Sequence, residues 1–400
     1  MFVYADNGAT TKTSKTALNA MLPIYEEFYG NPSSLHTTGQ RAKEKLEEAR
    51  QSVAARINAE PREITFTSGG SEADNQALFS AAAIGARGGK KHIISTKFEH
   101  HAILHTLDRL KLQGFEITLL DVNANGIVKP EDVKAAIRPD TALVSVMFAN
   151  NEIGTIQPIA EIGAICHEHG VLFHTDAVQA AGHLPIDVKA MNIDLLSLSA
   201  HKFHGPKGVG ALYARRGIRL ENVINGGAQE RGKRAGTENL PAIVGMAAAL
   251  DEACDNMARN AEKMTYLRDK LIRELSKIPF SVVNGDLEKR LPGNVNMCFE
   301  GIEGESLLLL LDRDGVEASS GSACTSGSLD PSHVLLAIGL PHEIAHGSLR
   351  LSLGDDNTEE EIDHIIETVP KVVSYLRDMS PVWEDLETGK QQHIICTKGA

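Results

Sequence analysis

Glycine, serine, acid and lysine residues follow apolar, strand-like runs in the first half of the chain. Gly70 and Ser71 come after the run EITFT and open a helical pattern. Asp176 comes after VLFHT, and Lys202 comes after DLLSLSA. In an open α/β sheet, ligands bind at the carboxyl ends of the strands, so these side chains can share one sheet edge. Taken singly, each has an ordinary explanation: a tight turn, a loop cap or a solvated surface lysine.

Taken together, these residues match what pyridoxal phosphate requires of a protein. The cofactor needs a lysine that forms a Schiff base, a carboxylate that keeps its pyridine nitrogen protonated, and a cradle for its phosphate. Lys202, Asp176 and the turn at Ser71 can supply all three, because N–H groups at a helix N-terminus bind phosphate. We therefore predict a pyridoxal-phosphate site. His201, beside the lysine, either belongs to this site or is a hydrogen-bonded core histidine.

A second reactive group is the thiol of Cys324. It lies in SSGSACTSGS, residues 319–328, where serine and glycine surround it. A free cysteine is most often a small buried residue, but this polar and pliant run disfavours an apolar core. A thiolate there is a chemically sensible nucleophile toward a cofactor-bound substrate. No catalytic role is expected for the other cysteines, which are Cys166, Cys254, Cys298 and Cys396.

The string HEIAH at 342–346 offers a competing interpretation, because HExxH places two zinc ligands on one helical face. Here a proline precedes the string and a glycine follows it at the threshold of a strand, which leaves little more than one helical turn. Cys166, His167 and His169 are also crowded, but positions i, i+1 and i+3 of a helix do not all face one ion. A zinc hydrolase is the weaker hypothesis, and no structural metal is expected.

The elements that must position these groups alternate between helical and strand-like runs from about residue 40 to 215. The strand-like runs, such as FEITLLD, ALVSVMF and VGALYAR, are apolar at nearly every position, which is typical of strands covered by helices on both faces. Thr358 and Glu361 have the spacing of a capping box before the last long helix. We predict an α/β fold with a mostly parallel sheet in a large domain, followed by a smaller α+β C-terminal domain.

The chain is expected to divide into four parts. Residues 1–15 form an N-terminal segment that packs with the small domain, and 16–258 form the large cofactor-binding domain. Residues 259–385 form the small domain that carries Cys324, and 386–400 form a mobile tail. A length of 400 residues exceeds the size at which one hydrophobic core keeps growing, which favours two domains.

Composition narrows the functional classes. A formal net charge of −13 disfavours binding to nucleic acid or anionic membranes. No apolar run reaches the ~20 residues that cross a bilayer, and no secretory signal is visible, so a cytoplasmic location is expected. Five cysteines without paired spacing suit a reducing compartment and not a disulfide framework.

The chain resembles the NifS/IscS-type cysteine desulfurases, a family of fold-type I pyridoxal-phosphate enzymes, and is closer to the NifS type. The resemblance covers about 380 residues, from YADNGATT through FTSGGSEADN, HTDAVQA, AHKFHGPKG and RAGTEN to SSGSACTSGSLDPSH and HGSLRLSL. Three features depart from the family pattern: Ser71 stands where threonine is common, Gly8 where asparagine or serine is common, and the tail after Lys390 is unlike family endings. The tail bears on partner recognition, because the family's C-terminal region often takes part in sulfur delivery.

The resemblance implies a role for each matching residue. The catalytic residues are Cys324, Lys202 and His100. The cofactor-binding residues are Lys202, Asp176, Gln179, Asn151, His100, Gly70, Ser71, Ser199, His201 and Thr237. Thr237 reaches the phosphate of the other subunit in a homodimer, and His100 stacks on the cofactor and carries protons. The substrate-binding residues are Arg350 and Asn151, and the planar fork of Arg350 suits a carboxylate.

The implied reaction converts L-cysteine to L-alanine. Lys202 removes the α-proton, and Cys324 attacks the substrate sulfur and keeps it as a persulfide. The sulfur then passes to an iron–sulfur scaffold or another acceptor, where Cys324 touches a cluster only transiently. Three rivals stay open: a selenocysteine lyase, an aminotransferase-like enzyme that uses Lys202 without Cys324, and an inactive, scaffold-binding relative.

Overall fold

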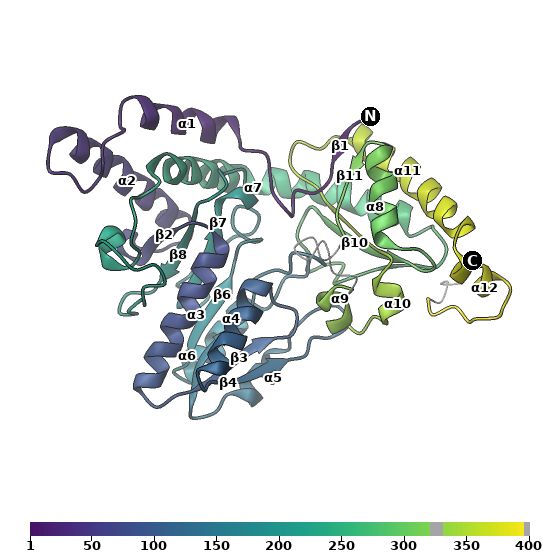
Figure 1. The fold of residues 1–400 in the computed structure, drawn as a ribbon, viewed down its shortest axis with the longest axis horizontal. Coiled ribbons are helices and arrows are strands. Elements are labelled where there is room, and N and C mark those ends of the chain that lie inside the picture. The colour runs from purple at the N-terminus through teal and green to yellow at the C-terminus, as the bar shows by residue number, and fades with distance from the viewer. Residues whose placement is uncertain (321–330, 396–400) are drawn as a thin grey trace.

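The computed structural model describes residues 1–320 and 331–395 of the chain (Figure 1). The helices are α1 (Lys15–Glu26), α2 (Thr37–Arg56), α3 (Gly70–Arg87), α4 (His101–Leu112), α5 (Pro130–Ala136), α6 (Ile159–Glu168), α7 (Leu240–Leu275), α8 (Gly304–Arg313), α9 (His333–Ala337), α10 (His342–Ala345), α11 (Glu359–Asp378) and α12 (Pro381–Glu387). The strands are β1 (Val3–Tyr4), β2 (Ile64–Thr67), β3 (His92–Thr96), β4 (Glu116–Leu120), β5 (Thr141–Ser145), β6 (Leu172–Asp176), β7 (Leu195–Ser199), β8 (Gly210–Ala214), β9 (Ser281–Val283), β10 (Asn294–Phe299), β11 (Val316–Glu317) and β12 (Ser348–Ser352).

The larger sheet is mostly parallel, as the apolar runs predict. Its seven strands, within the described residues, lie in the order β2-β8-β7-β6-β5-β3-β4. Only β8 runs against its neighbours, since it pairs antiparallel with both β2 and β7. The remaining pairs are parallel, so β3, β5, β6 and β7 all end at one edge of the sheet.

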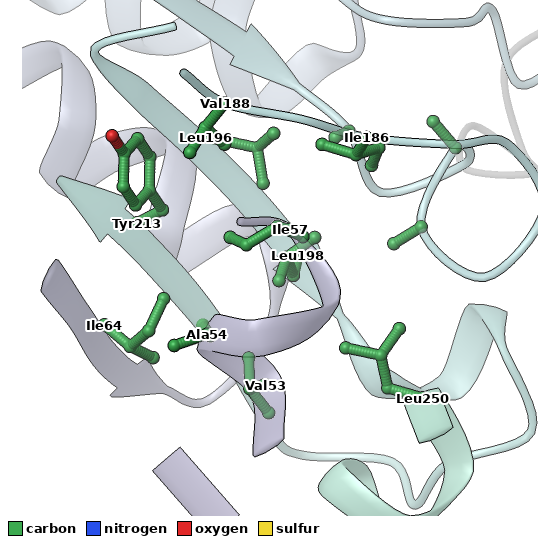
Figure 2. Packing of buried hydrophobic residues seen from close by; sticks show 14 of the residues in the cluster. Val53, Ala54, Ile57, Ile64, Ile186, Val188, Leu196, Leu198, Tyr213 and Leu250 are labelled. Carbon is green, nitrogen blue, oxygen red and sulfur yellow. The ribbon is translucent and has the colours of Figure 1, made fainter. Parts of the chain in front are cut away.

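Helices cover both faces of this sheet, because successive strand side chains point to opposite sides. Leu195 of β7 packs in a cluster with α3 and α4, whereas its neighbour Leu196 packs in a cluster with α2, α6 and α7. Figure 2 shows the second cluster, where Val53 of α2 and Ile57, which follows the helix, meet the strand side chains. This burial on both faces explains why the strands carry continuous apolar sequence.

The C-terminal part of the chain has its own core. Strands β12, β10 and β9 form an antiparallel sheet, packed with α8, α11 and the second half of α7. Strand β1 pairs parallel with β11, which brings the N-terminal segment to this part of the molecule. The long helix α7 joins the two cores, since Leu250 packs in the first and Leu267 in the second. The expected domain boundary at 258/259 therefore falls inside one continuous helix.

The last long helix begins as the sequence predicts. The side chain of Thr358 accepts the Glu361 N–H, and the Glu361 side chain accepts the Thr358 N–H, which confirms the capping box. Beyond α12, the His393 ring stacks on Phe280 with 3.5 Å between ring centroids, and its Nδ1 lies 3.0 Å from Glu300. The mobility expected for 386–400 stays a prediction, and residues 396–400 lie outside the described part.

Candidate active site

Lys202 lies just beyond β7, in a short 3-10 turn, η2 (Ala200–Lys202), at the carboxyl edge of the large sheet. Its Nζ donates to the backbone oxygens of Gly8, at 2.6 Å, and Ala9, at 2.8 Å. Gln179 Nε2 donates to the same Gly8 oxygen at 3.0 Å. The N-terminal segment thus folds over the lysine and joins residues that are far apart in the sequence.

Asp176 is the last residue of β6, the strand beside β7, and is buried. One carboxylate oxygen accepts the Val178 N–H at 2.9 Å. Burial raises the pKa of Asp176, while the nearby charge of Lys202 lowers it. A buried carboxylate of this kind gains from a cationic partner, which is what a protonated pyridine nitrogen provides.

The turn between β2 and α3 is shaped by its glycines. Gly69 has a φ of +153°, and a Cβ on Gly70 would lie 2.6 Å from Cγ2 of Val178. A Cβ on Gly69 would lie 3.7 Å from Oγ of Ser199, the last residue of β7. The absence of a Cβ on Gly70 and the positive φ of Gly69 let the first turn of α3, with Ser71, approach Val178 and leave its N–H groups suited to a phosphate.

The charge of Lys202 acts on two histidines of the site, His100 and His201. His100 is the N-cap of α4, where its Nδ1 accepts the Ala102 N–H at 3.1 Å. Burial, with a further contribution from Lys202, lowers the pKa of His100 to about 4, and burial likewise lowers the pKa of His201 to about 4. Both rings are therefore neutral at pH 7. In His100, Nδ1 is an acceptor, so Nε2 carries the proton.

Arg350 lies in the middle of β12, next to Gly8, whose backbone oxygen accepts from Lys202. Its guanidinium is buried and pairs with Asp6 at 2.8 Å, while Nη1 donates to the Asn151 backbone oxygen at 3.1 Å. Its Nε has no hydrogen-bond partner among the described residues. A buried guanidinium with an unused donor is able to accept an acidic ligand, and Asn151 lies beside it as the sequence predicts.

A cavity of about 550 Å³ opens beside Lys202. Asn151 and Gln179 line it on the sheet side, and Ser352 and Gly354 line it on the side of the small domain. The helix α7 and the N-terminal segment close the rest. The cavity is large enough for a small amino acid and reaches the lysine that the sequence singles out.

Cys324 and Cys396 lie outside the described residues. The described residue Ser319 exchanges backbone hydrogen bonds with Arg350, so the chain lies beside Arg350 just before residues 321–330. Cys166 and Cys298 are buried free thiols, and burial raises the pKa of each to about 12. Burial also raises the pKa of Cys254. These three thiols are poor nucleophiles, as the sequence patterns suggest.

Thr237 is exposed in the loop between β8 and α7 and does not line the cavity. The HEIAH string forms only the short helix α10, with the His342 and His346 rings 4.6 Å apart. Among the described residues, no cluster of three or more histidine, cysteine, aspartate or glutamate side chains could hold a metal ion. None of the helices in that part of the chain has the length and apolar character required to span a membrane.

The sequence reasoning missed several polar residues that the fold brings to the site. Asp6 is the partner of Arg350, and it stands in the YADNGATT motif, where only its place beside a matched string marked it. Asp74 and Glu99 are buried behind Asp176, and burial raises the pKa of Glu99 to about 8. Asp74 stands in the polar string SEADNQ and Glu99 in TKFEHH, so no local pattern marks either of them as a buried acid.

The whole chain has close relatives among known proteins. Residues 3–365 match the family model described as aminotransferase class-V. The chain is 57% identical over 393 residues to a protein named cysteine desulfurase IscS from Clostridium botulinum, with 98% of this chain and 99% of the relative covered. It is 55% identical over 380 residues to a protein of the same name from Methanosarcina thermophila, with 95% and 94% covered.

Solved structures share the fold described above. A NifS-like protein superposes with a TM-score of 0.88 at 39% identity, covering 94% of this chain and 100% of that protein. A structure described as SspA in complex with cysteine superposes with a TM-score of 0.79 at 36% identity, covering 89% and 99%. The likeness therefore extends over both cores and the site between them.

Proposed function

Because the chain belongs to the class-V aminotransferases and is a cysteine desulfurase of the IscS/NifS family, we propose that it holds pyridoxal phosphate on Lys202 and binds L-cysteine against Arg350. The observation that carries the proposal is the placement of a buried Asp176 and of Lys202 at the ends of neighbouring strands. The relative solved with cysteine supports the same substrate.

The cofactor fits the residues present. Lys202 would hold it covalently, Asp176 would face its pyridine nitrogen, and the first turn of α3 with Ser199 and His201 would face its phosphate. His100 would stack on the ring, with Asn151 and Gln179 at its phenolic oxygen. When bound, pyridoxal phosphate supplies an electron sink that stabilises negative charge at the substrate α-carbon.

The side chains then divide the remaining work. Arg350 fixes the substrate carboxylate with its planar fork, so the α-carbon faces Lys202. Lys202 would remove the α-proton of the substrate as a base. His100, which is neutral and protonated on Nε2, can donate a proton to the substrate and take one back. Asp176 would hold its negative charge toward the pyridine nitrogen of the cofactor.

Sulfur leaves through Cys324, which lies outside the described residues. Its thiolate attacks the substrate sulfur, a sulfur–sulfur bond forms on Cys324, and the carbon–sulfur bond of the substrate breaks. The electron pair of that bond stays with the carbon fragment, which takes up a proton and leaves as alanine. The terminal sulfur of this persulfide then passes to an acceptor thiol or an iron–sulfur scaffold protein, and the thiol of Cys324 is regenerated.

A homodimer is the second part of the proposal. Leu18, Leu22 and Tyr25 recur at helical spacing along α1, and Tyr29 follows; all four are exposed, and Leu35 is 94% exposed. Contiguous apolar surface of this kind marks a protein contact. We propose that a second copy of the chain covers this surface. Thr237 supports this choice, because it is exposed in one chain and could bind the cofactor phosphate of a second chain.

The test of the cofactor assignment is chemical mapping. Reduction of the cofactor-loaded protein with borohydride should fix the pyridoxyl group on the peptide that contains Lys202. Lys202→Ala should abolish that label and the yellow colour, whereas Lys207→Ala, at an exposed lysine nearby, should leave both unchanged. A label on any other lysine in the unmutated protein would refute the assignment.

A further inference from the structure

Two ion pairs hold the loop that carries Thr237 beside the turn between β2 and α3, residues 68–71, which we call the phosphate turn: one pair is with α2 and the other with α3. We call this loop, residues 222–238, the arm. The buried Arg50 of α2 donates two hydrogen bonds, of 2.7 and 2.8 Å, to the arm residue Glu230. The Nε of the arm residue Arg234 donates a hydrogen bond of 2.9 Å to Glu72 of α3.

Each of these acids also accepts a backbone N–H from the chain that leads into the phosphate turn. Glu230 accepts from Phe66 of β2 at 3.0 Å, and Glu72 accepts from Ser68 at 2.7 Å. Burial acts to raise the pKa of Glu72, but its hydrogen bonds with Arg234 and Ser68 outweigh this and lower it, so the carboxylate stays charged. Glu72 of α3 therefore contacts both Ser68 and the arm, and Glu230 of the arm contacts both β2 and α2.

The side chain of Gln76, buried in α3, makes a third connection. Its Nε2 donates to the backbone oxygen of Lys233 within the arm, at 2.7 Å, and to that of Glu221, the residue just before the arm, at 3.1 Å. Within the arm, Gln229 accepts the Gly236 N–H at 3.0 Å and closes the last turn before Thr237.

The arm backbone is also strained where it meets the ion pairs. Glu230 and Arg231 have φ values of +49° and +60°, in the left-handed region that non-glycine residues rarely adopt. Such conformations persist only where the surrounding contacts over-determine them. The base of the arm is therefore fixed to the phosphate turn, whereas Thr237 at its end is exposed.

We propose that Glu72, Arg234, Glu230 and Arg50 are positioning residues that act across the dimer, by presenting Thr237 of one protomer to the cofactor phosphate of its partner. The inference rests on the proposed homodimer and goes beyond it. The phosphate turn of each site and the arm that completes the other site form one rigid unit. Disturbing the arm's base in one chain therefore weakens cofactor binding in the other chain.

Hybrid dimers separate this effect from one inside the same chain. Two differently tagged chains are co-expressed and the mixed dimer is isolated; one chain carries Lys202→Ala, so only its partner binds the cofactor covalently. Arg234→Gln is placed in the Lys202→Ala chain. The affinity of the partner's site for pyridoxal phosphate, followed by the visible absorbance of the covalently held cofactor, should fall by about tenfold, as expected for loss of a charge-assisted contact.

Asn225→Ala is the control in the same chain. Asn225 lies in the same arm, is exposed, and takes part in neither of the ion pairs that join the arm to α2 and α3. This control should leave the affinity within twofold of the parent hybrid. Glu72→Gln, which keeps an oxygen for the Ser68 N–H, is the second variant and should act like Arg234→Gln.

A third hybrid distinguishes failure of this inference from failure of the homodimer. Thr237→Ala in the Lys202→Ala chain should weaken the partner's site if the site is composite. If Thr237→Ala acts across the dimer while Arg234→Gln and Glu72→Gln act only within their own chain, the positioning role is wrong. If Thr237→Ala has no effect on the partner, the composite site itself is wrong, and the inference falls with it.

Discussion

The two walls of the active site are built in different ways. On the large-domain side, Asp176 and Lys202 lie at or just beyond the ends of adjacent strands of one sheet, and each follows directly from an apolar run. On the other side, Arg350 lies inside a strand and is held by Asp6 and Asn151, which are 344 and 199 residues away in sequence. The cofactor side depends on sheet topology, and the substrate side depends on long-range contacts between segments.

This difference separates the tasks of the two walls. Groups fixed at strand ends keep their geometry as long as the sheet exists, which suits a permanently held cofactor. A guanidinium held by the N-terminal segment and by the Asn151 turn responds to how those segments sit together, which suits a ligand that enters and leaves. Changes to the first wall should therefore alter the cofactor and the rate, and changes to the second should alter substrate affinity.

The largest expected effect lies on neither wall but in the thiol that takes the sulfur. Cys324→Ser should keep the cofactor colour, because the groups that hold the cofactor are unchanged. Sulfide and alanine production from L-cysteine should fall by about 10³-fold or more, since a hydroxyl is not ionised near neutral pH. Sulfide release and labelled sulfur on tryptic peptides measure this, with Cys298→Ser as the buried control. Parental rates in the Cys324 variant would mean that the thiol is a bystander.

A change on the cofactor wall should reduce the rate next. Asp176→Asn removes the charge opposite the pyridine nitrogen while nearly preserving shape, and kcat should fall by about 10²-fold, as for loss of one preorganised electrostatic group. The KM for L-cysteine should change by less than threefold, because Arg350 is untouched. Steady-state kinetics separates the two. A raised KM with unchanged kcat would contradict the division between the walls.

The phosphate turn gives a smaller effect that is limited to cofactor affinity. Gly70→Ala would place a Cβ 2.6 Å from Val178, so the turn must shift, and overpacking of this kind costs about 1–3 kcal/mol. The dissociation constant for pyridoxal phosphate should rise by about tenfold. Gly88→Ala, at the other end of the same helix, has its nearest neighbour at 3.5 Å and should leave the constant unchanged. Equal affinities in the two variants would argue against a phosphate at this turn.

The smallest effect is on stability and concerns His100 in the cofactor-free protein. Its pKa is about 4 in the fold and near 6.5 when unfolded, so between these values the unfolded chain binds the extra proton. Stability from this group is therefore fully present above pH 6.5 and is lost as the pH falls toward 4. Denaturant titrations at pH 4.5 and 7 should show a pH dependence that is smaller by about 1–3 kcal/mol in His100→Asn. An identical dependence in both proteins would exclude the buried, neutral ring.

Most of the fold could be predicted from the sequence. The strand within EITFT, the mostly parallel sheet and the capping box at Thr358 follow from local patterns, and the structure has them. Lys202 and Asp176 were recognised for the same reason, since strand ends are marked by a change from apolar to polar residues. These features need no knowledge of what lies far away in the chain.

The rest depended on contacts that no local pattern encodes. The pairing of Asp6 with Arg350, and of Arg50 with Glu230, joins segments whose separation is set by the whole fold. Arg350 itself was found by resemblance, because an arginine within the strand SLRLS has no distinctive spacing. A long helix at about 240–278 could be expected, but its contribution to both cores could not, since a long amphipathic helix has the same pattern in one domain or two.

The most direct test of the two-wall account is a titration with L-cysteine, followed by the absorbance of the bound cofactor. In Arg350→Lys, the cofactor should bind with unchanged affinity, while the cysteine concentration at half-change should rise by about 10- to 100-fold, as expected for loss of a bidentate charge-assisted contact. In Asp176→Asn, that concentration should stay within threefold of the unmutated protein. Weakened cofactor binding in the Arg350 variant, with unaltered cysteine dependence, would contradict the account.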